Sequence, residues 1–163
     1  MNNFLWTNIF KRTESEVDVI ARLWQQTPLF KNIPARHIRS LAENMHLRNF
    51  EPGESVFRQG EQGAGAILVV EGQVKIMASD VQISVLESGD FFGEIALAET
   101  DKRTADAFSV KRSRLVYFMK AELEEWTEIE PMLGNIFLIN LASILAHRLY
   151  LANQMLSHQS RSL

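Results

Sequence analysis

The chain has 163 residues, of which 46% are hydrophobic and 23% charged, and its net charge at pH 7 is −3. These values predict one globular domain and exclude disordered and collagen-like chains. The charge gives no basic surplus for binding a nucleic-acid backbone. Cysteine is absent, which excludes disulfides, thiolate zinc sites, iron–sulfur clusters and a cysteine nucleophile.

The sequence carries no pattern of a secretory signal or a membrane span. Residues 1–10 are rich in aromatic and aliphatic side chains but lack a basic start and a cleavage site, and a docked core helix is favoured over a membrane or partner contact. The most apolar stretch, 132–145, is interrupted by polar residues and is too short to cross a bilayer. We therefore expect a cytoplasmic protein.

Residues 1–45 have the pattern of helices. Thr13 and Glu16 have the spacing of a capping box, Pro28 is expected to end the first helix, and Pro34 is expected to begin a second. The predicted buried positions of these helices are Val17, Ile20, Ala21, Trp24, Ile38, Leu41, Ala42 and Met45.

Residues 46–119 contain short runs rich in valine, isoleucine and phenylalanine, separated by turn residues. The predicted strands are 46–50, 55–58, 66–70, 73–78, 82–86, 105–110 and 115–119. Short strands with turns at regular intervals predict an antiparallel sandwich, barrel or jelly roll.

Residues 120–158 return to a helical pattern, with a short acidic helix at 120–129 and a long one that begins at Pro131. The long helix has a heptad seam, which consists of Leu138, Ala142, Leu145, Leu149, Ala152 and Leu156. A neighbouring stripe consists of Phe137, Leu141, Ile144, Leu151 and Met155, and is broken only by Arg148. Two stripes favour a homodimer, in which one packs on the β-region and the other on a second copy. The alternative is one wide core-facing stripe in a monomer.

The segment with the clearest chemistry is 92–97, followed after a short gap by 103–105. A glycine at 93 lets the backbone approach a ligand, and Glu94 can accept hydrogen bonds from a sugar hydroxyl. The guanidinium of Arg103 presents a planar fork of donors suited to phosphate oxygens, and backbone N–H groups near Glu94 could add to the anion site. Together these groups suit a nucleotide, although such a Glu and Arg pair is more often a surface salt bridge.

The segment resembles the phosphate-binding cassette of the cyclic nucleotide-binding domain family, which includes catabolite-activator-type (Crp/Fnr-like) regulators, kinase regulatory subunits and nucleotide-gated channels. The cassette positions that fit are Phe92, Gly93, Glu94, Ala96, Leu97, Arg103, Thr104, Ala105 and Ala107. A second family motif fits at Val56, Gly60, Glu61, Gly63, Ile67, Leu68, Val69 and Gly72. The resemblance extends over residues 28–156.

The resemblance implies a mainly β fold with flanking helices: an antiparallel, jelly-roll-like β-roll with N-terminal helices and a long C-terminal helix. Residues 1–27 would form an N-terminal helical extension, and residues 28–130 the nucleotide-binding β-roll with its flanking helices. Residues 131–163 would form the C-terminal lid and dimerisation helix with its tail.

The resemblance also assigns roles to single residues. Arg103 and Thr104 would bind the cyclic phosphate, and Glu94 and Gly93 would bind the ribose. Asn153, on the helix that covers the base, would lie near the adenine edge. The cassette packing would involve Phe92, Ile95, Ala96 and Ala105.

Two positions depart from the family pattern. Lys102 stands where many members have proline, and adds a cation near the anion site. Asp106 falls on the same strand face as Thr104. Its carboxylate would weaken anion binding if that face lined the pocket; an outward, solvated position is favoured.

The favoured function is a stand-alone cAMP or cGMP sensor, not an enzyme, which signals through movement of its C-terminal helix to an effector protein that is not identified. The alternative is a degenerate member that binds no nucleotide and serves as a dimerisation or docking module. The chain ends at Leu163, so no DNA-binding module is expected. The histidines at 37, 46, 147 and 158 have no metal-site spacing, although haem ligation by one of them stays open. We expect no cofactor and no metal.

Overall fold

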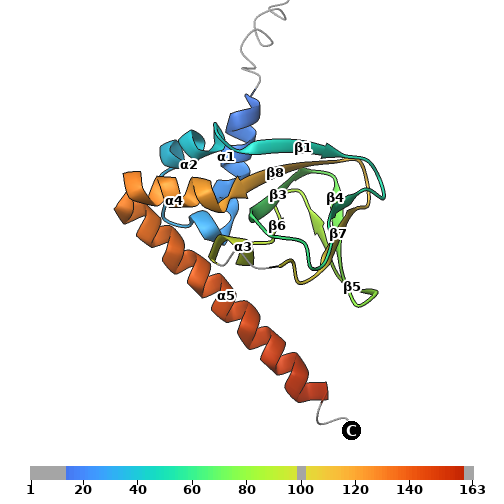
Figure 1. Cartoon of the computed structure of the whole chain (residues 1–163). Helices are drawn as coiled ribbons and strands as arrows, with labels where there is room; N and C mark the ends of the chain where they lie inside the picture. Colours follow the sequence, from blue (N-terminus) through green and yellow to red (C-terminus); the bar gives the residue numbers. More distant parts are fainter. Residues whose placement is uncertain (1–13, 99–101, 160–163) are drawn as a thin grey trace, which may run out of the picture.

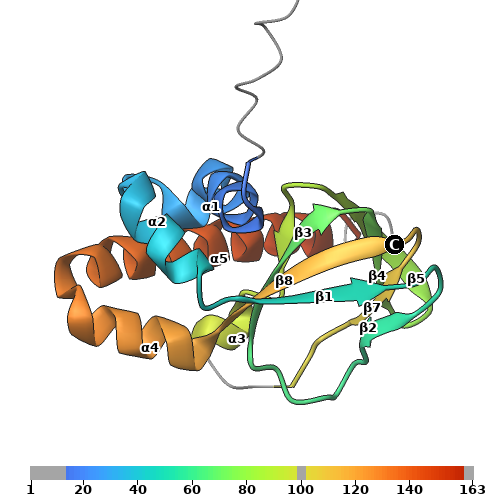
Figure 2. The same ribbon diagram turned by 90° about the horizontal axis from the view of Figure 1, so that it is seen from above.

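The computed structural model describes residues 14–98 and 102–159. Two four-stranded antiparallel sheets form a β-roll, and helices gather at one end of it (Figures 1 and 2). The strand order is β1-β8-β3-β6 in one sheet and β2-β7-β4-β5 in the other. The strands are β1 (His46–Phe50), β2 (Ser55–Phe57), β3 (Gly65–Glu71), β4 (Gln73–Ala78), β5 (Val81–Glu87), β6 (Phe91–Phe92), β7 (Asp106–Ser109) and β8 (Ser113–Met119). The predicted β-roll is confirmed.

The N-terminal helices lie where the prolines predict them. The helices before the roll are α1 (Glu16–Gln26), the 3₁₀ turn η1 (Pro28–Phe30) and α2 (Ala35–Ala42). The N-cap of α1 is Ser15, whose hydroxyl accepts a hydrogen bond from the backbone N–H of Asp18. The predicted capping residue Thr13 lies outside the described residues, as do the aromatic residues 1–10.

The core has two parts, which share strand β3. Ala66, Leu68 and Val70 pack against the helices, whereas Ile67 and Val69 point into the roll. This burial on both faces explains why the sequence of β3 is an unbroken apolar run. Among the helices, an aromatic cluster forms the centre of the larger part, with ring centroids 5.1–6.2 Å apart: Trp24, Phe30, Phe91, Phe118, Trp126 and Phe137.

The remaining helices are α3 (Ile95–Ala98), α4 (Lys120–Ile129) and α5 (Pro131–Gln159). The first part of α5 is fixed to the domain: Phe137 and Leu141 are buried, and the Asn140 side-chain amide donates to the backbone oxygens of Leu29 and Lys31. The later part runs away from the helical end of the domain and passes the roll (Figure 1), with Leu149 exposed.

By length and composition alone, α5 could cross a bilayer, because the apolar helix extends over 131–157. The sequence argument against a membrane span considered only residues 132–145. The apolar helix is longer than that segment, so its length alone does not exclude a span. The same helix packs against the aromatic core through Phe137, while only 17% of its most apolar stretch is buried in the domain.

Candidate ligand-binding site

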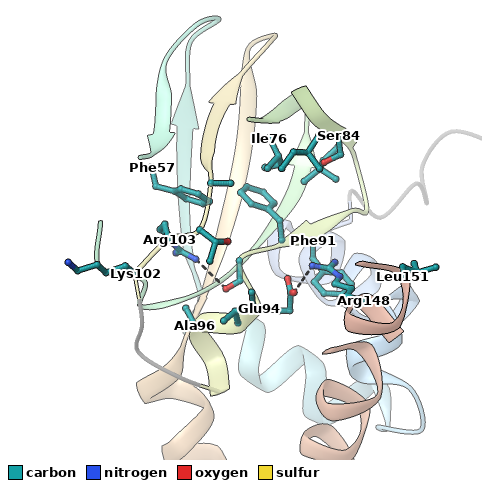
Figure 3. Close-up of a pocket in the computed structure, with 17 residues that line it drawn as sticks. Phe57, Ile76, Ser84, Phe91, Glu94, Ala96, Lys102, Arg103, Arg148 and Leu151 are labelled. Carbon is teal, nitrogen blue, oxygen red and sulfur yellow. Dashed lines mark hydrogen bonds and ion pairs between the residues drawn. The ribbon is translucent and has the colours of Figure 1, made fainter. Parts of the chain in front are cut away.

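A cavity of about 530 Å³ lies between the roll, the segment around α3 and helix α5 (Figure 3). Eight of the nine residues predicted for the site line it: Phe92, Gly93, Glu94, Ile95, Ala96, Arg103, Thr104 and Ala105. The structure therefore brings together two segments, 92–96 and 103–105, that six residues separate in the sequence. Most of the remaining wall is apolar and comes from β2, β4, β5 and β6, through Phe57, Ile76, Ile83, Leu86 and Phe91, with Ser84 among them.

Arg103 enters this cavity as a partly desolvated cation. Its Nη1 and Nη2 donate to the backbone oxygens of Gly93 and Gly65, each at 3.2 Å, and its guanidinium lies 4.4 Å from the centre of the Phe57 ring. Burial lowers the pKa of Arg103 below its ordinary value, although the residue stays charged at neutral pH. Among residues 14–98 and 102–159, no carboxylate forms a salt bridge with it. Its hydrogen bonds within the described residues go to neutral carbonyl oxygens, and the carboxylates of Glu61 and Glu94 act on it only through space. Its donors therefore suit an anionic ligand.

Gly93 is required beside this guanidinium for two reasons. Its φ of 72° lies in the left-handed region, and a Cβ atom there would overlap Nη1 of Arg103. The glycine of the cassette thus lets the backbone and the arginine pack directly against each other.

Glu94 is the most buried charged group at the site, with 1% of its surface exposed. Its Oε1 accepts a hydrogen bond from Nη1 of Arg148 on α5 at 2.5 Å (Figure 3). Its Oε2 is shielded from solvent and has no hydrogen-bond partner among the described residues. A buried acceptor without a donor is unfavourable, so a ligand hydroxyl at this oxygen would remove the penalty.

The short helix α3 fixes the carboxylate in place. Its turn is closed by hydrogen bonds from the N–H of Ala96 to the Gly93 oxygen and from the N–H of Leu97 to the Glu94 oxygen. Ala96 and Leu97 are both buried. Close packing of the cassette around Ala96, which the family resemblance implies, stays a prediction.

The two departures from the family pattern have different positions. Asp106 does not line the cavity; its Oδ1 accepts a hydrogen bond from the backbone N–H of Gln59 at 2.7 Å. Lys102 does line the cavity. The carboxylate that could have opposed an anion lies outside the cavity and holds the loop after β2, where the favoured interpretation expected an outward, solvated side chain.

Helix α5 reaches the cavity through residues that the sequence analysis did not assign to the ligand site. Asn153 is exposed and lies outside the lining residues, whereas Arg148 and Leu151 belong to them. The guanidinium of Arg148 also lies 5.6 Å from the centre of the Phe91 ring. The one signal in the sequence was that Arg148 interrupts an otherwise apolar stripe.

Comparison with known proteins identifies the family. Residues 47–129, half of the chain, match the model of the cyclic nucleotide-binding domain. The chain belongs to the cyclic nucleotide-binding domain family. The match covers both β-sheets and the whole cassette.

Among the relatives is the cAMP-dependent protein kinase regulatory subunit of Mycosarcoma maydis, which is 32% identical over 48% of this chain and 16% of its own length. The cyclic nucleotide-gated channel alpha-4 of Mus musculus is 30% identical over 70% of this chain and 21% of its own length. Among solved structures, the catabolite activator protein of Thermus thermophilus superimposes with a TM-score of 0.74 and 25% identity, over 82% of this chain and 63% of that one. The chain thus spans about a fifth of the length of these two curated relatives.

Proposed function

We propose that the chain binds a cyclic nucleotide, cAMP or cGMP, in the cavity between the roll and α5, and that it acts as a regulatory sensor and not as an enzyme. One observation carries the proposal: within the described residues, the same cavity holds a cation without a salt-bridge partner, Arg103, and a buried carboxylate oxygen without a donor, on Glu94. A phosphate joined to a sugar hydroxyl satisfies both groups at once.

The charge of the site favours a cyclic monophosphate over a nucleoside triphosphate. Within the described part of the chain, three cations line the cavity, on Lys102, Arg103 and Arg148, and Arg148 is paired with Glu94. A cyclic phosphodiester carries one negative charge, which the guanidinium of Arg103 can neutralise. A triphosphate would bring several more charges close to the carboxylate of Glu94, inside a cavity whose wall is mostly apolar.

The ribose hydroxyl is proposed to donate to Oε2 of Glu94. The other oxygen, Oε1, is already held by Arg148, so the carboxylate is oriented before the ligand enters. A fixed acceptor reduces the entropy that is lost when the ligand binds.

The output is proposed to be a change in the position of α5. Arg148 and Leu151 line the cavity, while the residues beyond them are exposed. A ligand that contacts both the roll and the helix stabilises one helix position over others, which shifts a population of conformations without chemistry. An effector protein would then recognise the new surface.

Calorimetric titration of cAMP and cGMP into the wild type, Arg103→Ala and Arg112→Ala tests the binding. Arg112 is the matched control, because it is exposed and pairs with Glu51 away from the cavity. We expect wild type and Arg112→Ala to bind one of the two nucleotides with the same affinity, and Arg103→Ala to bind it at least tenfold more weakly. No heat with the wild type would instead favour the non-binding alternative.

The heptad seam is proposed to be the interface of a homodimer. Leu138, Leu149 and Leu156 of the seam are 46–62% exposed, although Leu145 packs on the core. In the neighbouring stripe, Phe137 and Leu141 are buried in the domain, whereas Leu151 and Met155 are 43% and 69% exposed. The wide core-facing stripe of the monomer alternative would have both sets buried. A second copy of α5 supplies a matching apolar surface.

Sedimentation equilibrium tests this interface with Leu149→Glu and Met132→Glu. Met132 is also exposed but lies off the seam. We expect a dimer for wild type and Met132→Glu, and a monomer for Leu149→Glu. A monomeric wild type, or a dimer that survives Leu149→Glu, would contradict the interface.

A further inference from the structure

A second cavity, of about 420 Å³, adjoins the cavity between the roll and α5, which we call the nucleotide cavity. Arg103 and Phe57 line both. Its other walls come from β1, β8 and the loop between β2 and β3, and include His46, Arg48, Glu61 and Tyr117. We call it the basic cavity. Arg103 thus belongs to the walls of both cavities.

Positive charge exceeds negative charge in the basic cavity. Its lining residues include two guanidinium groups, on Arg48 and Arg103, and one carboxylate, on Glu61, which leaves an excess of one positive charge with His46 neutral. The Glu61 carboxylate already accepts a hydrogen bond from the backbone N–H of Arg58 at 3.0 Å. A second carboxylate, on Glu122, lies 3.9 Å from the His46 imidazole but does not line the cavity.

A buried hydroxyl points to a missing ligand in the same place. The Tyr117 hydroxyl is shielded from solvent and has no hydrogen bond of good geometry within the described part of the chain, although the Arg48 side chain lies close enough to interact with it. The guanidinium of Arg48 lies 5.8 Å from the centre of its ring. Burial raises the pKa of Tyr117, and the Glu54 carboxylate adds to this rise, although Arg48 and Arg103 both act to lower it. At neutral pH the hydroxyl therefore keeps its proton and can donate.

We propose that the basic cavity binds a phosphate-class dianion, either inorganic phosphate or a phosphomonoester, through Arg48, Arg103 and the Tyr117 hydroxyl. Guanidinium and hydroxyl donors from three separate parts of the chain suit the several oxygens of a phosphate. The occupant gives the buried hydroxyl an acceptor, and its two negative charges face the two guanidinium groups of Arg48 and Arg103.

Occupancy of the basic cavity then opposes nucleotide binding, because both ligands need Arg103. This second step rests on the proposed nucleotide function, whereas the anion site itself does not. An anion on the Arg48 side holds the Arg103 guanidinium and neutralises its charge. The cyclic phosphate then gains less from the same arginine.

Titration of inorganic phosphate into the ¹⁵N-labelled chain, followed by NMR, tests the site directly. Potassium chloride at equal ionic strength is the control, and Arg48→Gln and Tyr117→Phe are the variants. We expect saturable shifts of the Arg48, Gly65 and Tyr117 amides in the wild type, at least tenfold weaker binding in Arg48→Gln, and several-fold weaker binding in Tyr117→Phe. No saturable shift, or equal affinity in Arg48→Gln, overturns the site. Binding of glycerol phosphate in a parallel titration assigns a phosphomonoester, and its failure while phosphate binds assigns inorganic phosphate.

Calorimetry of cAMP in phosphate and in chloride buffers of equal ionic strength tests the antagonism. We expect phosphate to raise the apparent Kd several-fold for the wild type and to leave it unchanged for Arg48→Gln. An equal rise in both proteins means that phosphate acts in the nucleotide cavity, and this overturns the antagonism. If no cyclic nucleotide binds at all, the proposed function fails, while the NMR titration still decides the anion site.

Discussion

Replacing Arg148 by methionine removes the only described donor to the buried carboxylate of Glu94. Loss of one partner of a buried ion pair costs about 3–5 kcal/mol when the remaining charge stays dry. Arg148 is 49% exposed and the cavity is open to solvent, so water can reach Glu94 in the variant. We therefore expect a loss of about 2–3 kcal/mol, which lowers Tm by about 4–12 °C in a domain of this size.

Arg22→Met is the matched control for this change. The Arg22 side chain is also 49% exposed, but its partner Glu14 is 44% exposed, whereas Glu94 is 1% exposed. An exposed pair contributes about 0–1 kcal/mol. The two variants thus differ mainly in the burial of the remaining carboxylate.

Urea and thermal denaturation of Arg148→Met, Glu94→Gln and the double variant measure the coupling. We expect the double variant to lose at least about 1 kcal/mol less than the sum of the single variants, because it leaves no unpaired buried charge. Hydrogen exchange should also rise in the part of α5 beyond Arg148, which loses its link to the cassette. Additive losses within about 0.5 kcal/mol, or equal losses in Arg22→Met and Arg148→Met, would refute the reasoning.

Three further predictions concern the cassette, the helix anchor and pH. Gly93→Ala should abolish high-affinity nucleotide binding in calorimetry, because the new Cβ overlaps Arg103. Gly53 has the same left-handed backbone but open space around it, so Gly53→Ala should lose only about 1 kcal/mol in stability and leave binding intact. Phe137→Ala should cost about 3–5 kcal/mol in urea denaturation, while Leu149→Ala should leave the monomer's stability within about 0.5 kcal/mol, because Phe137 is fully buried and Leu149 is exposed. Burial raises the pKa of Glu122 in the folded protein, so the folded state binds its proton more tightly than the unfolded state does. The wild type should therefore lose stability relative to Glu122→Gln as pH rises through the ordinary glutamate pKa and above it. Parallel profiles of unfolding free energy against pH for the two proteins would contradict this.

Local patterns were sufficient to predict most of the fold. The strand at 46–50 and the helix at 120–129 have the predicted bounds, and α5 begins at the predicted Pro131. Strand β6 was missed because two residues, Phe91 and Phe92, are too few to establish a period of two. They form a strand because they pair with Leu68 and Ile67 of β3, a contact that no local pattern encodes.

The cassette residues of the candidate site could be predicted from the sequence, because both of their segments carry recognisable motifs. The residues that α5 contributes, Arg148 and Leu151, could not. Whether Arg148 or Asn153 reaches the cavity depends on how α5 is rotated and how far it has left the roll, and one residue changes the direction of a helical side chain by about 100°. The basic cavity was also beyond prediction, because Arg48 and Tyr117 meet only when β1 pairs with β8.

The most direct test of the account compares cAMP with adenosine, which lacks the phosphate, on the wild type and on Arg103→Ala by calorimetry. If Arg103 binds the phosphate, removing the phosphate should weaken binding to the wild type by about 10–150-fold, the effect of a lost charged hydrogen bond of about 1.5–3 kcal/mol. On Arg103→Ala, the two ligands should bind with nearly the same low affinity. An unchanged cAMP affinity in Arg103→Ala, or an equal penalty for adenosine on both proteins, would contradict the assignment of Arg103.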